Sequence, residues 1–411
     1  MDFNDSPEER EFRKKARAFL EQHLEPLGPD ESPSGLGERE DAAAIQRAKD
    51  WQATKFDHGW AVLTWPKEYG GQEMGRLEAS VFAQEEARFK TLPPIFGIGH
   101  GMLGPTIMTH GTQEQKDRFV KEMARGQVVW CQLFSEPAAG SDLAALRTSA
   151  VRDGDEWVIN GQKIWSTGAH FCDWGMIVTR TDPDVPKHDG LTYFIVDMND
   201  PGVECRPIKQ INGGSHFNEV FFSDVRVPDS QRLGGVGEGW KVAITTLMNE
   251  RVSIGSGGGG GRTKDLFRLA RDCRRNGRPA IEDAAVRARL ADIFITGKGL
   301  QYTGYRIQSA LARGGTPGPE GSISKAIGAP HSQQVASFAM ELQGAMGAVS
   351  QHGIALQDGL WQESYLGSPG LRIAGGTDEV LKNIIAERVL GLPSEHRADK
   401  GIPFRDVPTG S

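Results

Sequence analysis

Residues 149–167 read SAVRDGDEWVINGQKIWST, and this stretch decides the fold. Apolar and polar side chains alternate along it with a period of two, which is typical of a half-buried β-strand. The pairs Asp153-Gly154 and Asn160-Gly161 are of the kind that tight hairpin turns require. The stretch therefore predicts antiparallel strands joined by short turns.

The same period continues on both sides of this stretch. The segments that carry it are short and rich in β-branched and aromatic residues, as strands are. They read VVWCQLFSEP (128–137), WGMIVTRT (174–181), LTYFIVDM (191–198) and NEVFFSDVRVP (218–228). We therefore predict a central β-barrel-like or sandwich domain over residues 128–233.

Helical periodicity flanks this domain, with apolar residues three and four positions apart. The first helix is expected to begin at Ser6 as N-cap, with Pro7 at its first position and Glu9 completing a capping box. The predicted fold class is α+β and multidomain, with an N-terminal α-helical domain, the β-domain, a C-terminal α-helical bundle and a tail. These parts span residues 1–127, 128–233, 234–396 and 397–411, and the polar tail is expected to be mobile.

Composition argues against several classes of function. Lys and Arg number 47 against 54 Asp and Glu, the net charge is -7, and no basic cluster is visible, so nucleic acid is not an expected partner. The four cysteines, at 131, 172, 205 and 273, form no CxxC pair. We expect buried, reduced thiols in a cytoplasmic protein, and neither a metal site nor disulfides. No segment has the pattern of a membrane span or a signal peptide.

Two segments offer groups suited to a cofactor. SEPAAGSDLAAL (135–146) follows a strand and presents hydroxyls and amides that suit a polar ligand edge or a phosphate, although such residues also form ordinary turns. In NGQKIWST (160–167), Trp165 offers a broad apolar face, and Thr167 points the same way if the segment is extended. This pairing suits a flat heteroaromatic ring, and a half-buried strand tryptophan is the alternative.

These segments occur in one order with NEVFFSDVRVP, ERVSIG (250–255) and RIAGGTDEVLKNIIAERVLG (372–391). In that order and spacing the chain resembles the flavin-dependent acyl-CoA dehydrogenase family along nearly its whole length. The resemblance implies a C-terminal four-helix domain, FAD bound among the three domains, and removal of two hydrogens across Cα and Cβ of an acyl-CoA thioester. A base takes the α-proton while the β-hydrogen leaves as hydride to flavin N5.

The resemblance also assigns residues to the cofactor. Ser135 and Thr167 would hydrogen-bond the isoalloxazine edge, with Trp165 packed beside the ring. Ser141 would lie near both FAD and the pantetheine arm of the substrate. The other implied FAD contacts, some of them to a neighbouring subunit's FAD, are Gln132, Phe134, Ser166, Glu341, Gly344, Ala345, Thr377 and Glu379.

The catalytic base requires a separate assignment. Many family members carry a glutamate where this chain has Gly375, and the family's second location corresponds to Glu250, immediately before Arg251. We therefore expect Glu250 to be the base, with a pKa raised by burial, and a surface carboxylate on an amphipathic helix is the alternative. The Gly375 amide would stabilise the developing enolate, and Arg251 would bind substrate, orient the carboxylate or form a structural ion pair.

Five consecutive glycines at 257–261 follow the proposed base closely. They predict a broken or kinked helix, because each glycine inside a helix costs about 1 kcal/mol relative to alanine. A flexible linker and a phosphate-binding loop are the alternatives. A broken helix here would leave room for bulky acyl groups.

Four positions depart from the family pattern, and they bear on subunit assembly. Cys273 and Asn276 stand where an arginine and a phenylalanine are expected to reach the partner's FAD, and Arg274 or Arg275 could replace that arginine. Glu341 replaces a common glutamine, and Ala345 replaces a glycine of the turn that receives a neighbouring FAD.

The leading hypothesis is a catalytic acyl-CoA dehydrogenase that uses Glu250, passes electrons to an electron-transfer flavoprotein and forms a homodimer or homotetramer. A second hypothesis is a non-catalytic or half-competent companion subunit of a hetero-oligomer, which the changes at residues 273 and 345 favour. A third keeps the fold and makes O2 the oxidant of the flavin, as in an acyl-CoA oxidase or a flavin monooxygenase.

Overall fold

A computed structural model describes residues 5–28, 41–90, 92–256, 262–312, 321–351 and 353–408. The chain forms two compact units. The first comprises Met1–Lys209, Ser215–Glu250 and His396–Ser411, and the second comprises Gln210–Gly214 and Arg251–Glu395. The chain thus leaves the first unit within one helix and returns to it near the C-terminus.

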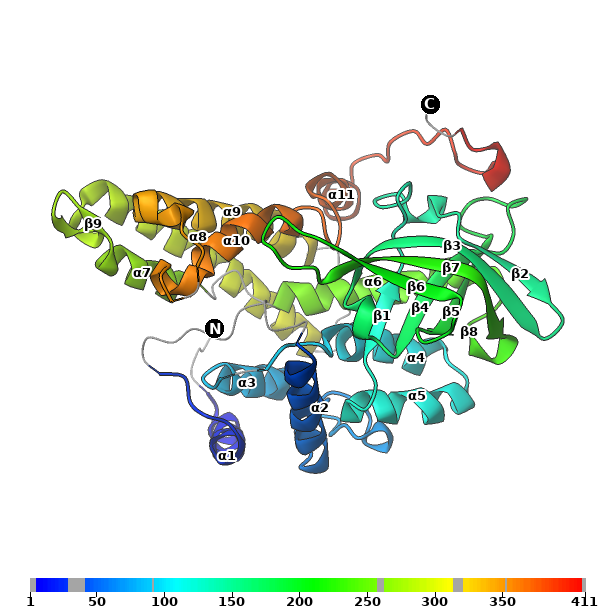
Figure 1. Ribbon diagram of the computed structural model, residues 1–411, viewed down its shortest axis with the longest axis horizontal. Coiled ribbons are helices and arrows are strands. Elements are labelled where there is room, and N and C mark those ends of the chain that lie inside the picture. The colour runs from blue at the N-terminus through cyan, green and yellow to red at the C-terminus, as the bar shows by residue number, and fades with distance from the viewer. Residues whose placement is uncertain are drawn as a thin grey trace. The chain divides into compact units, whose positions relative to one another are not determined.

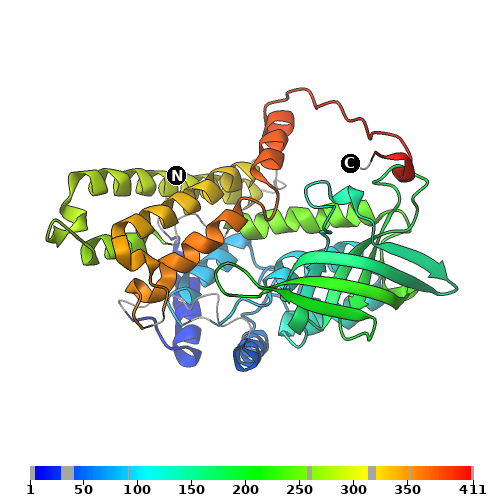
Figure 2. The ribbon, with the colours of Figure 1, turned by 45° about the horizontal axis from the view of Figure 1, so that its top comes forward.

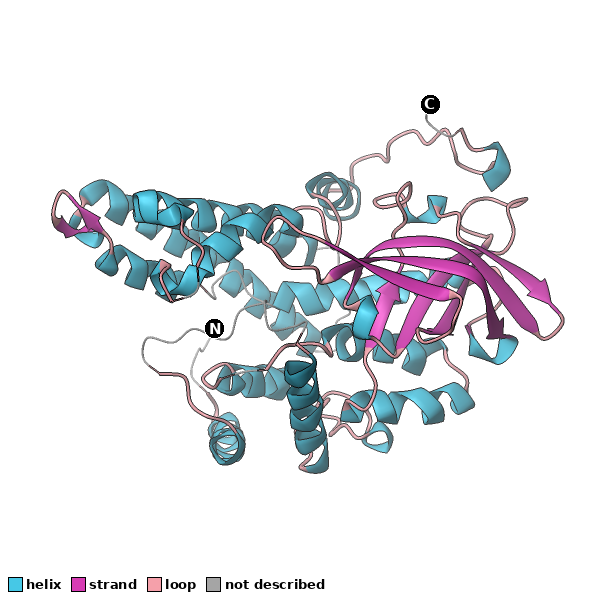
Figure 3. Ribbon diagram, in the orientation of Figure 1, coloured by secondary structure: helices cyan, strands magenta, loops and turns pink. Residues whose placement is uncertain are grey.

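Helices dominate both ends of the sequence, and strands lie between them (Figures 1 and 3). The α-helices are α1 (Pro7–His23), α2 (Ala42–Asp57), α3 (Arg76–Glu86), α4 (Gly104–His110), α5 (Gln113–Arg125), α6 (Gly239–Ser256), α7 (Thr263–Asp272), α8 (Ala284–Ala312), α9 (Gly321–Gln343), α10 (Leu360–Leu371) and α11 (Asp378–Ile384). The strands are β1 (Trp130–Leu133), β2 (Ser149–Asp153), β3 (Glu156–Thr167), β4 (Trp174–Arg180), β5 (Leu191–Asp197), β6 (Val203–Ile208), β7 (Phe217–Pro228), β8 (Arg232–Leu233), β9 (Arg274–Arg275) and β10 (Arg278–Pro279). The α+β class is confirmed.

One mixed sheet organises the first unit. Its strand order is β6-β7-β3-β2-β4-β5-β8, and β1 pairs with β4 in parallel. Along β4, Met176 and Val178 pack on one side against residues of α4, α5 and α6, whereas Ile177 packs on the other side. Because both faces of β4 and β5 are buried, these strands read as continuous apolar runs.

The second face of β4 and β5 is covered by other strands of the same sheet. Phe194 of β5 meets Trp157 of β3 with ring centroids 5.4 Å apart, and Val220 and Phe222 of β7 join the same apolar cluster. The sheet therefore curls over its own core, as its right-handed twist favours. Figure 2 shows this curl, which agrees with the barrel-like character predicted for the central domain.

The two predicted turns have different outcomes. Asp153-Gly154 joins β2 to β3, with Gly154 at φ 64°, as predicted. The prediction for Asn160-Gly161 is wrong, because both residues lie inside β3, where a register shift between Ile159 and Gly161 marks a bulge. The long strand partners β7 on both sides of the bulge, and this pairing outweighs the local turn preference.

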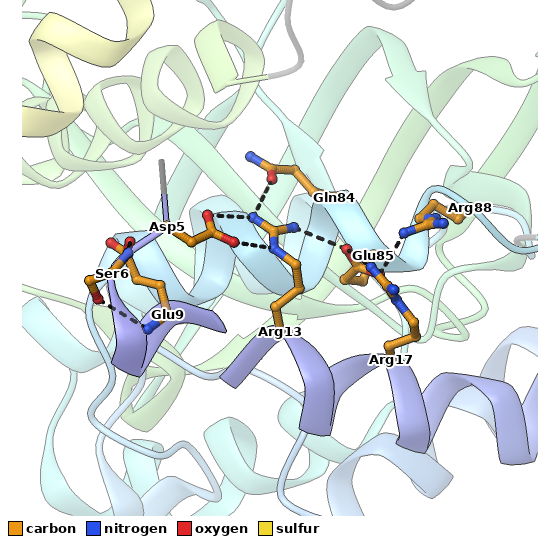
Figure 4. A network of polar contacts seen from close by, with 8 residues as sticks. All are labelled: Asp5, Ser6, Glu9, Arg13, Arg17, Gln84, Glu85 and Arg88. Carbon is orange, nitrogen blue, oxygen red and sulfur yellow. Dashed lines mark hydrogen bonds and ion pairs between the residues drawn. The ribbon is translucent and has the colours of Figure 1, made fainter. Parts of the chain in front are cut away.

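The N-terminal helix begins as predicted. Ser6 caps α1, and Glu9 closes the capping box. Further along, Arg13 and Arg17 of α1 donate to Glu85 of α3 at 3.0 Å and 2.8 Å (Figure 4). The Glu85 side chain is only 3% exposed. Burial alone would raise its pKa, but the hydrogen bonds from the two arginines outweigh burial and hold the pKa below its usual value.

The second unit is a helical bundle. Helices α7, α8, α9 and α10 share one apolar cluster that includes Leu269, Leu290, Phe338 and Trp361. This confirms the predicted C-terminal four-helix bundle. The structure adds a short β9–β10 hairpin with Asn276 at φ 52° in its turn, which the helical pattern did not predict. No helix in the described ranges is both long and apolar enough to cross a membrane.

The residues predicted as a mobile tail pack on the first unit. Phe404 is 7% exposed, its amide donates to the Val185 carbonyl at 2.9 Å, and Pro403 pairs with Pro186. The expectation of a mobile tail is therefore wrong for residues 397–408. The reason is physical: polar composition hides one aromatic anchor, and that ring packs together with backbone hydrogen bonds and an ion pair of the same segment.

Three of the four cysteines are buried, as predicted, and none forms a disulfide. Cys205 is partly exposed. Although they are distant in sequence, Cys131, Cys172 and Cys205 share one apolar cluster of the first unit. Burial raises the pKa of Cys172 well above its usual value, and a hydrogen bond to Cys131 raises it further. Burial also raises the pKa of Cys205 to about 12, so the thiols of Cys172 and Cys205 stay protonated at neutral pH.

Replacing Glu85 with glutamine is expected to lower the free energy of unfolding by about 3 kcal/mol at pH 7, because a nearly buried carboxylate is removed from its arginine partners. The loss shrinks as the pH falls. Since the folded pKa of Glu85 lies below its unfolded value of about 4.3, its contribution is complete above that value and disappears as the pH falls through the folded pKa. Urea unfolding at pH 7 and pH 3 measures both effects.

The exposed Glu11 of α1 provides the matched control, since Glu11→Gln is expected to change stability by less than about 0.5 kcal/mol. An equal loss in both variants would contradict the assigned role of Glu85.

Candidate functional site

A buried ion pair fixes the loop that follows β1. Lys163 of β3 is fully buried, and its ammonium donates to the Glu136 carboxylate at 2.8 Å and to the Phe134 carbonyl at 3.0 Å. The same carboxylate accepts the amides of Arg147 and Thr148 at 2.6 Å and 2.9 Å. The pair therefore joins the end of β1, the approach to β2 and the middle of β3.

Both members of this pair are charged at neutral pH. Burial lowers the pKa of Lys163 to about 8, although Glu136 opposes that shift. Burial would raise the pKa of Glu136, but Lys163, Thr148 and the Arg147 amide outweigh it and keep that pKa below its usual value. Both oxygens of the Glu136 carboxylate and the ammonium nitrogen of Lys163 have charged or backbone partners, as burial of charge demands.

Trp165 adopts a strained conformation at the end of β3. Its φ is 62°, in the left-handed region, and the register with β7 shifts between Lys163 and Ser166. The side chain is 56% exposed and meets Phe217 edge to face at 6.0 Å. We expected Trp165 and Thr167 to point the same way if this segment is extended. The left-handed residue and the register shift interrupt the extended backbone at this point. A large aromatic face is instead presented outward by backbone strain of about 1 kcal/mol.

The neighbours of Trp165 divide between core and surface. The Ser166 hydroxyl is buried without a hydrogen-bond partner in the described structure. The backbone carbonyl of Ser166 accepts a hydrogen bond from the Asn218 side-chain amide at 2.9 Å. Thr167 and Ser135 are half-buried, and the Ser135 carbonyl accepts the amide of Ile164 at 2.9 Å. The segment after β1 therefore lies directly beside the end of β3.

Two other predicted residues of this region differ in exposure. Phe134 is 4% exposed, and its ring lies edge to face with Tyr193 at 5.8 Å, so only its backbone remains for a ligand. Ser141 is exposed at the far end of the same loop.

Glu250 lies beside β1. It is half-buried, and Gln132 of β1 donates to its carboxylate at 3.4 Å. One helical turn earlier, Thr246 is fully buried between Thr106 and Tyr193, with oxygen separations of 3.0 Å and 3.1 Å. Residues four apart share a helix face, so this anchor turns Glu250 toward the sheet. Glu250 is therefore not simply a surface carboxylate on an amphipathic helix, which was the alternative interpretation of the sequence.

The structure describes only part of the segment that contains Arg251 and the five glycines. Arg251 continues α6, but its side chain lies outside the described part of the chain, as do residues 257–261. The predicted break at the glycines is therefore untested. The helix is regular up to Ser256, where its description ends.

A second group of predicted residues lies in the helical bundle. Gly375 and Gly376 have φ values of 65° and 98°, and Thr377 caps α11 by accepting the Val380 amide at 3.3 Å. Lys325 of α9 donates to the Gly376 carbonyl and holds this turn. A glutamate at 375 would need a left-handed backbone, which explains physically why glycine suits this position. Glu379 is exposed in the first turn of α11.

The other predicted cofactor residues of the bundle are at the end of α9. Glu341 forms an ion pair with Arg289, and Gly344 at φ 54° and Ala345 begin an exposed 3₁₀ turn. Gln362 of α10 holds this turn through the Met346 and Val349 carbonyls at 3.3 Å and 2.8 Å. Cys273 is buried, so a reactive or charged role does not follow from its place.

Sequence reasoning missed the residues that hold these groups in place. Lys163 had a usable signal, because it shares the inward parity of Trp157 and Ile159 along β3, and a lysine on a buried face requires a partner. The other missed residues contact the site segments only through tertiary packing and carry no local signal. They are Glu136, Thr246, Asn218, Lys325 and Gln362.

Comparison with known proteins agrees with this geometry. The chain matches the N-terminal, middle and C-terminal domains of acyl-CoA dehydrogenase over residues 6–127, 131–225 and 237–390. Together these matches cover most of its length, so the chain belongs to the acyl-CoA dehydrogenase family. It is an oxidoreductase of the class that dehydrogenates acyl-CoA thioesters.

Two curated relatives and one solved structure illustrate the likeness. Acyl-CoA dehydrogenase FadE34 of Mycobacterium tuberculosis is 40% identical over 354 residues, which cover 86% of this chain and 47% of FadE34, so the chain spans about half of that relative. Acyl-CoA dehydrogenase IpdE1 of the same organism is 36% identical and covers 94% of this chain and 98% of IpdE1. The structure named Tcur3481-Tcur3483 steroid ACAD has a TM-score of 0.81 and 31% identity, and covers 96% of this chain and 100% of its own.

Replacing Lys163 with methionine is expected to lower the free energy of unfolding by about 3–5 kcal/mol, because Glu136 is left as an unpaired buried charge. Adding Glu136→Gln should recover part of this loss, since glutamine still accepts a backbone amide and carries no charge. Urea unfolding of the two single variants, the double variant and the wild type forms a complete double-mutant cycle.

Exposed Lys209 provides the control, and Lys209→Met is expected to stay within about 0.5 kcal/mol of the wild type. A double variant as unstable as the sum of its parts would refute the coupling.

Proposed function

We propose that the protein removes two hydrogens across Cα and Cβ of an acyl-CoA thioester, with Glu250 as the base that takes the α-proton. The observation that carries this proposal is the place of Glu250, half-buried beside β1 and held by Gln132. A carboxylate in such a position can hold a proton and release it within one cycle. At Gly375, where many family members have their glutamate, no side chain can act.

FAD is the proposed cofactor, and the residues of the first unit fit a flat ring system with polar edges. The exposed face of Trp165 supplies an apolar wall, and the half-buried Ser135 and Thr167 supply hydroxyls nearby along the chain. Within the described part of the chain the buried Ser166 hydroxyl has no hydrogen-bond partner, so it is one group in this region whose hydrogen bond a ligand could supply. When bound, FAD supplies the acceptor for the β-hydride.

The bundle residues are proposed to hold the polar parts of cofactor and substrate. The Gly375 amide would donate to the thioester carbonyl and stabilise charge on the enolate oxygen. Thr377 and Glu379 would contact the phosphate and ribose region, and the turn at Gly344 and Ala345 would meet the FAD of a neighbouring subunit. Ser141 and Arg251 are the proposed contacts of the substrate itself, and Ser141 is proposed to lie near FAD as well.

For the acyl group we propose a bulky, ring-bearing substrate such as a steroid acyl-CoA. The solved structure most useful here is named a steroid ACAD and is 31% identical over nearly the whole chain. The absence of a side chain at position 375 agrees with a substrate that needs space. The proposed electron acceptor is an electron-transfer flavoprotein, and the proposed location is the cytoplasm, where the protein would form a homodimer or homotetramer.

Glu250→Gln is expected to abolish reduction of the bound flavin by substrate. Removal of a general base typically costs roughly 10²–10⁴-fold in rate. Anaerobic bleaching of the FAD absorbance after addition of acyl-CoA measures the step directly. The surface variant Glu204→Gln in β6 is the matched control and should bleach as the wild type does. Equal bleaching of wild type and Glu250→Gln would eliminate Glu250 as the base.

Ring-bearing acyl-CoAs are expected to give a higher kcat/KM than straight-chain acyl-CoAs of similar carbon number. The reason is that a site shaped for a rigid ring gains more from apolar burial of that ring than of a flexible chain, which must also lose conformational freedom. Steady-state kinetics with a steroid, a branched, a long and a short acyl-CoA test the expectation. A preference for the short straight chain would contradict it.

A companion subunit of a hetero-oligomer is the second candidate. Cys273 is buried and Asn276 occupies a hairpin turn, so neither residue offers a cationic contact to a neighbouring FAD, and Arg274 and Arg275 of β9 are the exposed cations left to replace it. The name of the related steroid structure also joins two proteins. The FAD content of the purified chain separates the two candidates, because an isolated companion subunit would hold much less than one FAD per chain.

A further inference from the structure

The C-terminal segment His396–Pro408, here called the strap, lies beyond the part of the chain that matches the family, which ends at residue 390. It returns to the first unit and runs along the loop 181–190 between β4 and β5 (Figures 1 and 2). The Phe404 and Arg405 amides donate to the Val185 and Pro183 carbonyls at 2.9 Å and 3.0 Å. The strap therefore pairs with this loop through its backbone.

An aromatic anchor secures the strap. The guanidinium of Arg180 lies 3.7 Å from the centroid of the buried Phe404 ring, and that of Arg147 lies 5.4 Å from it. Arg180 also donates to the Lys187 carbonyl at 2.7 Å and to the Ala144 carbonyl at 2.6 Å. The same arginine thus touches the strap, the loop 181–190 and the loop after β1. A cation over a ring in a dry environment is attracted by the negative face of the ring, so this contact holds the strap against the first unit.

A second link is ionic. Lys187 is 5% exposed, and its ammonium contacts Asp142 at 2.7 Å and also Asp399 of the strap. The hydrogen bond from Lys187 lowers the pKa of Asp399 to about 2, so this link is intact throughout the neutral range. Asp142 follows Ser141 directly in the chain. Lys187 therefore ties the strap to the residue beside the proposed substrate contact.

We propose that the strap positions the Ser141–Asp142 loop for binding of the thioester substrate, with Lys187, Asp399 and Phe404 as positioning residues. This inference rests on the proposed function, in which Ser141 contacts the pantetheine arm. The argument is mechanical: Gly140, Ser141 and Asp142 form an exposed stretch of this loop, and a buried lysine that also contacts the strap binds Asp142, the residue next to Ser141. The strap affects substrate affinity, whereas the proposed flavin contacts at Ser135, Trp165 and Thr167 lie outside the exposed stretch 140–142 that it restrains.

Three variants test the proposal in the full, FAD-loaded protein. Truncation after Glu395 removes the strap, Asp399→Asn weakens its ionic link, and Phe404→Leu keeps apolar bulk but removes the aromatic face. Asp406→Asn is the matched control, because Asp406 lies exposed in the same segment. For the truncated chain we expect KM for acyl-CoA to rise roughly tenfold with kcat changed less than about twofold, and smaller rises for the two point variants. FAD content should be unchanged.

Hydrogen exchange of the amides in residues 137–147 and 181–190 is the second measurement, and it requires no turnover. Both loops should exchange faster in the truncated chain than in the wild type or in Asp406→Asn. An unchanged KM, or a fall of kcat accompanied by loss of FAD, would overturn the proposal. If wild-type flavin is not bleached by any acyl-CoA, the proposed function fails. The exchange data then decide alone, and equal exchange with and without the strap would overturn its hold on the loop.

Discussion

The ion pair between Lys163 and Glu136 is the interaction on which the arrangement of the first unit depends. It brings the end of β1, the residues before β2 and the middle of β3 to one point inside the protein. A buried pair adds little net stability relative to apolar residues of the same size, but it tolerates only one geometry, because any displacement leaves a charge without a partner. Such a pair is useful here because it fixes the relative positions of three segments that are separate in the sequence.

Helix α6 supplies the second fixed relation. Its position is set by an unusual contact for a core, three hydroxyl groups from α4, β5 and α6 that satisfy one another out of water. Apolar packing alone would allow a helix to rotate slightly, whereas hydrogen bonds of defined length fix its rotation about the axis. Because Glu250 lies one helical turn after Thr246, the rotation of the helix also sets the direction of the Glu250 carboxylate. The catalytic proposal for Glu250 therefore depends on Thr246, a residue that would touch no ligand.

Much of the fold could be predicted from the sequence, for reasons visible in particular residues. The cap at Ser6, the hairpin at Asp153-Gly154 and the helices of the bundle depend on neighbours within four positions, and local patterns contain that information. Asn160-Gly161 was misread because β7, about 60 residues away, decides its conformation. The docking of Phe404 was missed for the same reason, since its partners are Arg180 and Arg147.

The site was predictable where motifs name residues and unpredictable where tertiary contacts assign their roles. The strained backbone of Trp165 has a consequence for how this protein tolerates change. Glycine or asparagine would adopt its left-handed conformation at lower cost, and the exposed ring contributes little to the core. At position 165 the residue that would make the folded protein most stable is therefore not the residue that exposes an aromatic ring. A laboratory selection for heat resistance alone would drift away from tryptophan here, and its survival in the sequence indicates a requirement other than folding.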